Sequence, residues 1–329
     1  MSSLPKHVAS HILVSISSVA LVVLCFCCFY LYSNTKQSQQ ILTVQNEPDT
    51  ILESARCSVF DQSPNSITSQ STSYKISDGV QSRTYRVHTP DNFDRQTRYP
   101  IILSFDGVAG SGKRIESFSG LDSLPAIIVY PDSLMGTHGR TAWQGAPYSP
   151  PRANDMQFIK NVLTHVSENY CVDSSHIFTV GMSNGGGFAV LVGCELGSRI
   201  RAVASISGAF YAPCKGDVKG QSLLIIHSTA DRQVPIDGSP RRKLPVVRKW
   251  VTDQAAQRSC REQVKSAQMQ NATRYTWSHC GDNDATVRFM IIKNQQHGWL
   301  EVPSTAEQTL RARTAWYIWD FFRNTYATN

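Results

Sequence analysis

The sequence predicts an α/β fold, with a mostly parallel central sheet that helices cover on both faces. From about residue 100 onward, short apolar runs typical of buried strands alternate with longer stretches of helical periodicity. Such alternation is typical of a parallel sheet. In addition, the apolar run 177–180 leads through a glycine-rich turn directly into a helical stretch. A sharp strand-to-helix connection of this kind favours the same fold class.

The expected elements follow from these patterns in chain order. Strands are expected near residues 74–76, 84–89, 100–105, 126–130, 177–180, 202–206, 222–226 and 287–292. Helices are expected near residues 154–169, 184–196, 245–257 and 306–323. Few residues remain outside these elements, so the sequence predicts no large lid domain and a fairly open site.

The turn after the fifth expected strand carries the strongest functional signal. It reads Gly181-Met182-Ser183-Asn184-Gly185, which matches G-x-S-x-G. At such a turn the serine is expected to adopt a strained backbone conformation, and its hydroxyl projects from the top of the sheet. A Cβ at Gly181 or Gly185 would collide with the neighbouring strand or helix. The pattern therefore predicts that Ser183 is a nucleophile rather than part of a turn without chemistry.

A nucleophilic serine needs a base and an orienting acid. In the α/β-hydrolase fold, an Asp or Glu and then a His follow the serine, each on the loop after a later strand. Asp231 follows the seventh expected strand, and His297 lies in the loop after the eighth. Asp237 is the alternative acid, but it lies beyond a proline and is expected to be a solvated turn residue. His227 lies within the seventh strand and is expected to pack or bond locally.

The loop after the third strand allows two interpretations. Residues 107–114 read Gly-Val-Ala-Gly-Ser-Gly-Lys-Arg, which satisfies G-x-x-x-x-G-K of a phosphate-binding loop. That interpretation is disfavoured because Arg114 stands where a Ser or Thr hydroxyl must hold Mg²⁺. In an α/β-hydrolase this loop supplies one N–H of the oxyanion hole, here assigned to Val108, and the residue after the nucleophile, Asn184, supplies the other.

The composition is that of an ordinary globular domain, with 41% hydrophobic and 17% charged residues among 329. The net charge of +7 is modest. No long run of Lys or Arg is present, so no nucleic-acid partner is expected.

One N-terminal segment departs from this composition. Residues 12–32 contain no charged side chain and are rich in Val, Leu, Ile, Phe and Cys. As a helix they would be about 31 Å long, which matches the hydrocarbon core of a bilayer. The stretch is longer than the apolar region of a cleavable signal peptide and ends in bulky residues. It therefore favours an uncleaved signal anchor, with the lipid bilayer as a partner, over a removed signal peptide.

The expected domain organisation follows from this segment. Residues 1–11 form a short cytoplasmic N-terminus, and 12–32 form the transmembrane anchor. Residues 33–73, rich in Ser, Gln and Thr, form a flexible stalk pinned at Cys57. Residues 74–329 form one catalytic domain outside the cytosol. The chain is thus expected to be a single-pass membrane protein of the secretory pathway, or a secreted protein if the segment is cleaved.

Cysteine usage agrees with an oxidising compartment. Six cysteines lie beyond the apolar segment, and this even number predicts disulfides: Cys57, Cys171, Cys194, Cys214, Cys260 and Cys280. The one pairing predicted is Cys260 with Cys280, because both lie in a turn-rich stretch before the last strand. Asn271 begins an Asn-Ala-Thr glycosylation sequon in that stretch. No Cys-x-x-Cys or His cluster has zinc-site spacing, so no metal is expected.

Several short blocks, found in the same order from about residue 85 to the C-terminus, carry a family resemblance. They are Ala126–Pro131, Trp143–Pro147, Tyr170–Asp173, Gly181–Phe188, Ser207–Tyr211, Trp250–Cys260 and Asn294–Trp299. In these blocks the chain resembles the type C fungal feruloyl esterases of the esterase/polyhydroxybutyrate-depolymerase family. The resemblance implies a serine esterase of the secretory pathway with Ser183, Asp231 and His297 as its triad.

Two positions depart from the family pattern. The chain has Phe105-Asp106-Gly107 where the family usually has Phe-His-Gly, and Asn154-Asp155 where it usually has paired aspartates. Asp106 puts a carboxylate beside the expected oxyanion hole, where its charge would oppose the developing oxyanion. The alternative, slightly favoured, is that Asp106 points away and caps the loop through nearby N–H groups.

The resulting hypothesis is a serine carboxylesterase without a cofactor that hydrolyses hydroxycinnamoyl or related esters of plant cell-wall polysaccharide. Alternatives are a short-chain carboxylesterase, an acetylxylan esterase, a polyhydroxybutyrate depolymerase, or a non-catalytic membrane-anchored binding protein on an esterase fold. Trp143 and Gln144 are candidates for the substrate pocket. For Trp143, plain loop packing is an equally good alternative.

Overall fold

The computed structural model describes residues 57, 71–261, 264–281, 284–303 and 310–325. The anchor expected at 12–32 and the stalk expected at 33–73, apart from Cys57 and 71–73, lie outside these residues. Among the helices that are described, none has the length and apolar character needed to cross a bilayer.

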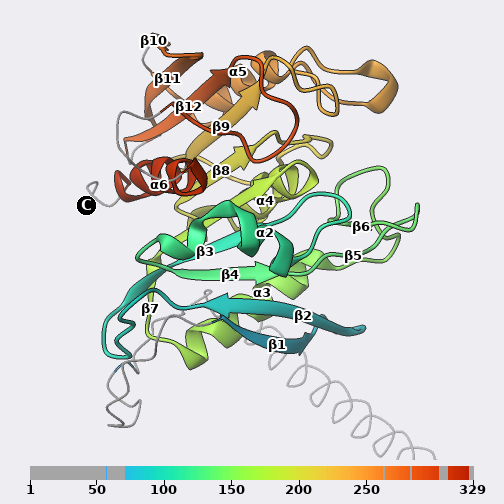
Figure 1. The fold of residues 1–329 in the computed structure, drawn as a ribbon, viewed down its shortest axis with the longest axis vertical. Coiled ribbons are helices and arrows are strands. Elements are labelled where there is room, and N and C mark those ends of the chain that lie inside the picture. Colours follow the sequence, from blue (N-terminus) through green and yellow to red (C-terminus); the bar gives the residue numbers. More distant parts are fainter. Residues whose placement is uncertain (1–56, 58–70, 262–263, 282–283, 304–309, 326–329) are drawn as a thin grey trace, which may run out of the picture. The chain divides into compact units, whose positions relative to one another are not determined.

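The core of the domain is one 10-stranded sheet with the order β1-β2-β4-β3-β7-β8-β9-β12-β11-β10 (Figure 1). Its central six strands are all parallel and comprise β4 (Ile127–Pro131), β3 (Tyr99–Phe105), β7 (Val172–Met182), β8 (Ala202–Ile206), β9 (Ser222–Ser228) and β12 (Ala285–Ile292). Antiparallel strands flank this block, namely β1 (Ser71–Ser77) and β2 (Ser82–His88) at one edge and β11 (Ala272–Cys280) and β10 (Lys265–Met269) at the other. The predicted mostly parallel sheet is confirmed.

Helices cover both faces of the sheet, because both faces of the parallel strands are apolar. Along β3, Ile101, Leu103 and Phe105 belong to one buried cluster and Ile102 to the other. The first cluster includes side chains of α3 (Asp155–Asn169), α4 (Asn184–Leu196) and α5 (Val247–Gln257). The second includes side chains of α2 (Gly112–Ser119) and α6 (Leu310–Arg323), which lie on the side facing the viewer in Figure 1. This is the α/β-hydrolase arrangement.

Three features differ from the sequence-based expectation. The stretch before the last strand was expected to be a turn-rich loop, but it forms the hairpin β10–β11, joined by the two-residue turn 270–271. A helix, α2, follows the glycine-rich loop after β3. A small antiparallel pair, β5 (Leu134–Met135) and β6 (Thr141–Ala142), lies in the loop after β4. Within the described range no separate lid domain is present, and residues 54–329 form one compact unit.

Three disulfides cross-link the domain. They join Cys57 to Cys171, Cys194 to Cys214, and Cys260 to Cys280. The last is the pairing that the sequence predicted, and it joins the end of the α5 region to β11.

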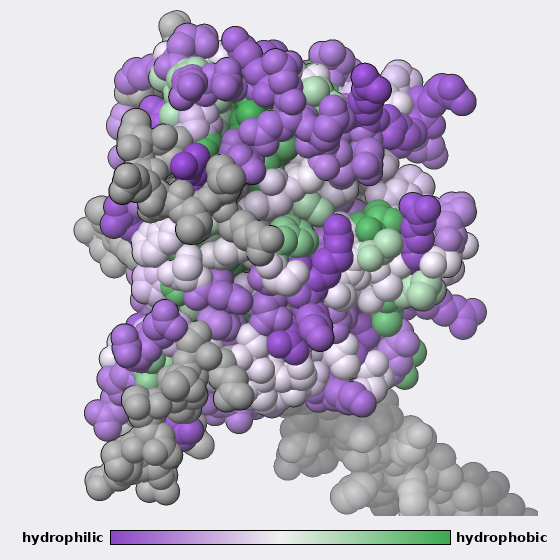
Figure 2. Space-filling model, viewed as in Figure 1, coloured by the Kyte–Doolittle hydropathy of each residue, from purple (hydrophilic) through white to green (hydrophobic). Residues whose placement is uncertain are grey.

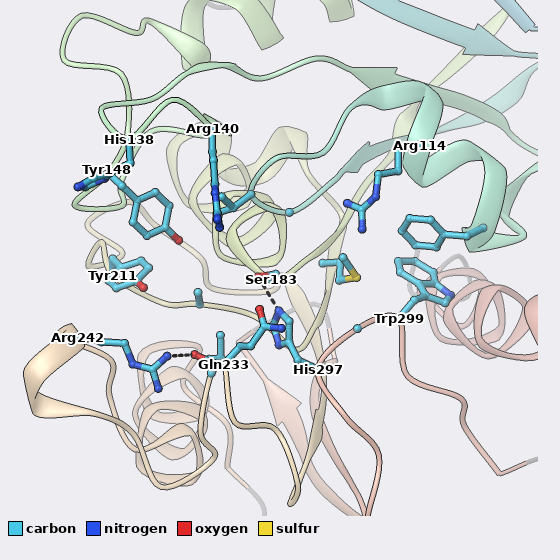
Figure 3. Close-up of a pocket in the computed structure, with 17 residues that line it drawn as sticks. Arg114, His138, Arg140, Tyr148, Ser183, Tyr211, Gln233, Arg242, His297 and Trp299 are labelled. Carbon is cyan, nitrogen blue, oxygen red and sulfur yellow. Dashed lines mark hydrogen bonds between the residues drawn. The ribbon is translucent and has the colours of Figure 1, made fainter.

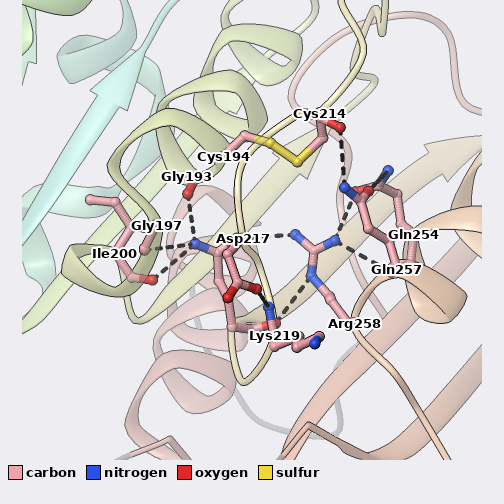
Figure 4. Close-up of a disulfide and its surroundings, with 11 residues drawn as sticks. Gly193, Cys194, Gly197, Ile200, Cys214, Asp217, Lys219, Gln254, Gln257 and Arg258 are labelled. Carbon is pink, nitrogen blue, oxygen red and sulfur yellow. Dashed lines mark hydrogen bonds between the residues drawn. A yellow bond between two sulfur atoms is a disulfide. The ribbon is translucent and has the colours of Figure 1, made fainter.

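A buried arginine lies below the second disulfide (Figure 4). The Arg258 guanidinium is fully buried and donates to the carbonyl and side-chain oxygens of Gln221 and to Gln254 Oε1, at 2.7–3.1 Å. Because it has only neutral partners among the described residues, burial lowers the pKa of Arg258 to about 9. The Gln221 amide in turn donates to the carbonyls of Gly193 and Ile200. This network fixes the C-terminal end of α4, the helix that follows Ser183.

The surface seen in Figure 2 is mostly hydrophilic, with small scattered apolar areas. Large apolar side chains are exposed at only a few described positions, among them Val80 and Met135.

Candidate active site

Ser183 lies between β7 and α4, in the strained conformation that its motif predicts. Its φ is 57° and its ψ is −122°, a region that residues with a Cβ rarely occupy. The turn is compatible only with glycine on either side, since a Cβ on Gly181 would lie 2.2 Å from the Gly185 carbonyl oxygen. A Cβ on Gly185 would lie 2.2 Å from the Phe105 carbonyl oxygen. The expected steric reason for both glycines is confirmed.

The structure brings together the three residues expected to form a triad, although they are far apart in the sequence. His297 Nε2 lies 2.9 Å from Ser183 Oγ, and His297 Nδ1 lies 2.7 Å from Asp231 Oδ2 (Figure 3). With Asp231 ionised, the proton of the imidazole is held on Nδ1. Nε2 is then free to accept the hydroxyl proton of Ser183.

Asp231 is held as a carboxylate by its surroundings. Its side chain is buried, which opposes ionisation, but it accepts hydrogen bonds from His297 and from the N–H groups of Val234 at 2.8 Å and Gln233 at 2.9 Å. These donors outweigh burial and lower the pKa of Asp231 below its ordinary value. Asp237, the alternative acid, is exposed in the following turn.

His227 bonds locally, as expected for a histidine within a strand. It is fully buried, and its Nε2 donates to the Val234 carbonyl oxygen at 2.8 Å. The same Nε2 lies 3.7 Å from Asp231 Oδ2. Burial lowers the pKa of His227, so the ring is neutral and adds no second positive charge beside Asp231.

Two serine hydroxyls, which the sequence gave no reason to single out, position the loop that carries His297. Ser207 Oγ donates to the Gly298 carbonyl at 2.9 Å, and Ser228 Oγ donates to the Gln295 carbonyl at 2.6 Å. Both serines lie at the C-terminal ends of buried parallel strands. That position in the sequence is the feature from which their role could have been predicted. They fix the backbone on either side of His297.

The two expected oxyanion-hole donors, Val108 and Asn184, come from the loop after β3 and from the first residue of α4. The N–H groups of Val108 and Asn184 make no hydrogen bond within the described part of the chain. Val108 lines the cavity in front of Ser183. Its neighbour Gly107 approaches so closely that a Cβ there would lie 3.1 Å from Ser183 Cβ. The assignment of these two N–H groups to an oxyanion hole stays a prediction.

Asp106 does not present a free charge to this site. Its carboxylate accepts from the N–H groups of Gly107 at 2.7 Å and Ser111 at 3.2 Å, and Arg114 Nη1 lies 3.0 and 3.1 Å from its two oxygens. The side chain is 2% exposed. Burial raises the pKa of Asp106, while the Gly107 N–H and the Arg114 charge oppose that rise. The geometry matches the loop-capping alternative and not a carboxylate aimed at the oxyanion.

Trp143 and Gln144, the expected pocket residues, do not line the cavity. Trp143 is 1% exposed, stacks on Phe188 with ring centroids 4.6 Å apart, and meets Phe105 edge-on. The Gln144 side chain instead accepts from the N–H of Met156 at 3.2 Å. The expectation of an aromatic pocket wall at Trp143 was wrong, because the Trp143 loop turns its aromatic ring into the core.

The cavity in front of Ser183 has a volume of about 800 Å³. Its walls come mainly from loops after the strands (Figure 3), and they include Arg114, Phe118, Arg140, Tyr148, Tyr211, Arg242 and Trp299. None of these side chains was predicted from the sequence to line a pocket. Most of them lie in loops, which lack the periodicity that identifies strands and helices, so only the fold reveals that they converge.

Among the described residues, one group of side chains that does not line the cavity has the chemistry of metal ligands. Ligand atoms of His88, Glu116 and Asp122 lie within 4.8 Å of one another. Protein groups already contact them, since Arg86 pairs with Glu116 at 2.5 Å and the Tyr130 hydroxyl donates to Asp122 at 2.5 Å. Glu116 and Asp122 are thus already engaged in ion pairs and hydrogen bonds with other protein groups.

The expected glycosylation site lies on the surface. Asn271 is exposed in the turn between β10 and β11, with a φ of 56°. Thr273, the third residue of the sequon, donates to Gln268 Oε1 at 2.9 Å.

Comparison with known proteins places the chain among esterase relatives. It is 30% identical to feruloyl esterase D of Neurospora crassa over 165 residues, which cover 46% of this chain and 53% of the relative. It is 29% identical to a probable feruloyl esterase C of Aspergillus terreus over 175 residues, 50% of this chain and 61% of the relative. The chain thus spans between half and two thirds of the length of these curated relatives. No protein-family model matches it.

Among solved structures, an acetyl xylan esterase from Aspergillus awamori superposes with a TM-score of 0.54 at 15% identity. The match covers 77% of this chain and 99% of the other. At this identity the similarity establishes the α/β-hydrolase fold alone. The resemblance to fungal feruloyl esterases noted from the sequence is confirmed by the curated relatives.

Proposed function

We propose that this chain, a relative of the fungal feruloyl esterases with an α/β-hydrolase fold, is a serine carboxylesterase. The observation that carries the proposal is the unbroken contact chain from Ser183 Oγ to His297 Nε2 at 2.9 Å and from His297 Nδ1 to Asp231 at 2.7 Å. This is the arrangement by which a histidine activates a serine hydroxyl.

The reaction proceeds through an acyl-enzyme. His297 Nε2 takes the proton of Ser183 as Oγ attacks the ester carbonyl carbon, and the carbonyl oxygen becomes an oxyanion. The N–H groups of Val108 and Asn184 stabilise that oxyanion. Collapse breaks the bond to the alcohol oxygen, which receives the proton from His297. Water then attacks the acyl-enzyme with His297 as base, and the acid is released from Ser183.

Within this reaction class, we propose a feruloyl esterase-like substrate, an aromatic acyl group on plant cell-wall polysaccharide. The curated relatives named as feruloyl esterases support this choice. The about 800 Å³ cavity with Tyr148, Tyr211 and Trp299 in its walls offers aromatic surface for a phenolic ring. A panel of methyl ferulate, acetylated xylan and hydroxybutyrate oligomers separates this substrate from the alternatives.

The alternative of a non-catalytic binding protein rested on Asp106 and the unusual N-terminal segment. The hydrogen bonds that Asp106 accepts from Gly107, Ser111 and Arg114 remove the first reason. Fluorophosphonate labelling of the full chain tests the remaining choice, because only an activated serine reacts. We expect labelling and p-nitrophenyl acetate hydrolysis in the natural chain and neither in Ser183→Ala. An unlabelled, correctly folded natural chain contradicts the proposal.

We also propose that residues 74–329 act outside the cytosol and that residues 12–32 are an uncleaved anchor. The three disulfides support an oxidising compartment, and the exposure of Asn271 supports its glycosylation. N-terminal sequencing of the mature protein, together with carbonate extraction of membranes, tests the anchor. A mature N-terminus beyond residue 32 contradicts it.

A further inference from the structure

The cavity in front of Ser183 is lined by more positive than negative charge. Three arginines, Arg114, Arg140 and Arg242, contribute to its walls, and none of the described residues that line it is Asp or Glu. Figure 3 shows Arg140 and Arg242 reaching the cavity from two different loops, with Ser183 to one side of both. A substrate bound there is exposed to this charge.

The three arginines differ in how far their charge is already compensated. Arg114 is paired with the buried carboxylate of Asp106, at 3.0 Å. It also lies over the Phe118 ring, with its guanidinium carbon 5.5 Å from the centroid. The Arg114 charge is therefore largely compensated by the Asp106 carboxylate.

The Arg242 guanidinium is held in place by neutral oxygen atoms, and its charge is not paired with a carboxylate of the described residues. It lies at the end of the short 3-10 helix η3 (Pro240–Arg242), and its guanidinium donates to the carbonyl oxygens of Gln233 and Arg232 and to Ser239 Oγ. Carbonyl and hydroxyl oxygens orient a guanidinium but carry no net charge. The positive charge of Arg242 remains available at the cavity wall.

Arg140 is the least compensated of the three. It directly precedes β6 in the loop after β4, and its side chain makes no ion pair with any described residue. In Figure 3 its guanidinium points from this loop into the cavity. An arginine in this position can make two parallel hydrogen bonds to one carboxylate.

The aromatic groups between these arginines do not cancel their charge. The rings of Tyr148 and Tyr211 meet edge-on with centroids 5.8 Å apart. Burial raises the pKa of the Tyr148 phenol well above its ordinary value. The phenol therefore stays neutral and can donate a hydrogen bond to an anion.

We propose that the cavity selects esters that carry a negatively charged group such as a carboxylate, with Arg140 and Arg242 as its cationic partners. This inference rests on the proposed esterase activity and narrows its substrate class. An anionic group on either the acid or the alcohol part of the ester would be attracted to the two guanidinium groups. Clefts lined by one sign of charge raise the association rate of oppositely charged ligands by about tenfold or more at low salt.

The test uses two matched pairs of esters that differ only in charge. The first pair is 4-acetoxybenzoate and its neutral methyl ester, which places the charge on the leaving group. The second is 4-nitrophenyl hemisuccinate and its neutral methyl ester, which places the charge on the acyl group. Each kcat/KM is divided by the rate of non-enzymatic hydroxide hydrolysis, to remove differences in intrinsic reactivity.

For the natural full chain we expect a charged-to-neutral ratio of about ten or more in at least one pair at about 50 mM salt, falling as salt is raised to about 500 mM. Arg140→Gln and Arg242→Gln should each lower the ratio by about threefold to tenfold. The control is Arg98→Gln, which removes the same charge at an exposed position directly before β3. Arg98 lies at the opposite end of β3 from the Gly107–Val108 loop, and its variant should keep the ratio.

The outcomes separate this inference from the proposed esterase activity. Binding of the same ester pairs to Ser183→Ala, measured by calorimetry, needs no turnover. Tighter binding of the charged ester without turnover in the natural chain overturns the esterase proposal alone. Turnover with a ratio of one or less in both pairs, or with a ratio that both arginine variants retain, overturns the anion selectivity alone.

Discussion

Trp143 is hydrogen-bonded to both segments of the proposed oxyanion hole, to Asn184 on one side and to Asp106 on the other. The backbone N–H of Trp143 donates to Asn184 Oδ1 at 2.8 Å, and its indole N–H donates to the Asp106 carbonyl at 3.0 Å. Asp106 immediately precedes the loop that carries Val108, and Asn184 supplies the second donor. One buried residue thereby sets the separation of the two N–H groups.

Trp143→Phe should lower kcat by about tenfold with little change in KM. The variant loses the indole hydrogen bond to Asp106 and part of the ring that stacks on Phe188. The Val108 loop can then shift relative to Asn184, and such a shift affects the oxyanion more than the bound ester. Steady-state kinetics with p-nitrophenyl acetate measures both constants. Trp319→Phe, a buried tryptophan of α6 on the other face of the sheet, is the control for general destabilisation. Equal losses of kcat in both variants would refute a positioning role.

Asp106→His should lower the melting temperature without raising kcat. The substitution removes a buried acceptor for the N–H groups of Gly107 and Ser111 and the partner of Arg114, and it should cost about 2 kcal/mol of stability or more. Melting curves and kinetics on the same preparation measure both effects. Asp106→Asn keeps one carbonyl acceptor and should lose less stability. A higher kcat at an unchanged melting temperature would show that the Asp106 charge opposes catalysis.

The sequence was sufficient to predict the parts of the site that lie on regular elements. Ser183, Asp231 and His297 each lie in the turn or loop that follows an apolar strand. Their position at the C-terminal edge of a parallel sheet therefore follows from chain order. The parallel strands and the helices α3, α4, α5 and α6 were identifiable for the same reason. Their hydrophobic periodicity is strong.

The parts that the sequence did not predict depend on loops and on competing patterns. The hairpin β10–β11 was missed because turn residues and two cysteines outweighed the run of β-formers at Thr273–Trp277. Helix α2 was not predicted because the glycine cluster before it indicated a loop. Ser111 nevertheless caps the helix by accepting from the Arg114 N–H at 3.2 Å. The cavity walls at Arg140 and Arg242 could not be predicted, because no local pattern states which loops meet.

Asp231→Asn should lower kcat by about 10⁴-fold while leaving the fold intact. The amide can still accept from Val234, but it no longer favours the imidazole tautomer with the proton on Nδ1. His297 Nε2 would then carry the proton and could not accept one from Ser183. Kinetics with p-nitrophenyl acetate, with a circular dichroism spectrum of the variant, checks this expectation. Asp237→Asn, in the exposed neighbouring turn, is the control, and a loss of similar size there would revive Asp237 as the acid.

The stability lost in Asp231→Asn should depend on pH. The pKa of Asp231 is lower in the folded chain than in the unfolded chain, so its carboxylate stabilises the fold above the unfolded value of about 3.9. That contribution is lost as the pH falls through the folded pKa. The stability difference between the natural chain and Asp231→Asn should thus be constant near neutrality and shrink below about pH 4. Urea unfolding across this range measures it, and a difference that grows on acidification would reverse the assigned sign.

Arg83→Met should destabilise the domain by about 3–5 kcal/mol at neutral pH, because it leaves buried carboxylates without their cation. Arg83 Nη2 lies 2.8 Å from Asp155 Oδ1, and Nη1 lies 3.4 Å from Asp78 Oδ2, with all three side chains buried. Asp155 Oδ2 also accepts from the Gln144 N–H at 2.7 Å. The pair therefore supports the backbone next to Trp143.

The pH dependence of this variant distinguishes charge from packing. Burial already raises the pKa of Asp155, and the Arg83 charge opposes that rise. Without Arg83 the folded pKa rises further, so the folded state binds more protons than the unfolded state, and the stability of Arg83→Met falls as the pH increases from about 4. The double variant Arg83→Met/Asp155→Asn removes the charge at Asp155 and should recover part of the loss at neutral pH. Urea unfolding of both variants at several pH values tests this. The Arg83 guanidinium also lies over the Phe158 ring, 4.1 Å from its centroid. A loss of stability that is independent of pH and is not reduced in the double variant would assign the whole effect to this lost packing.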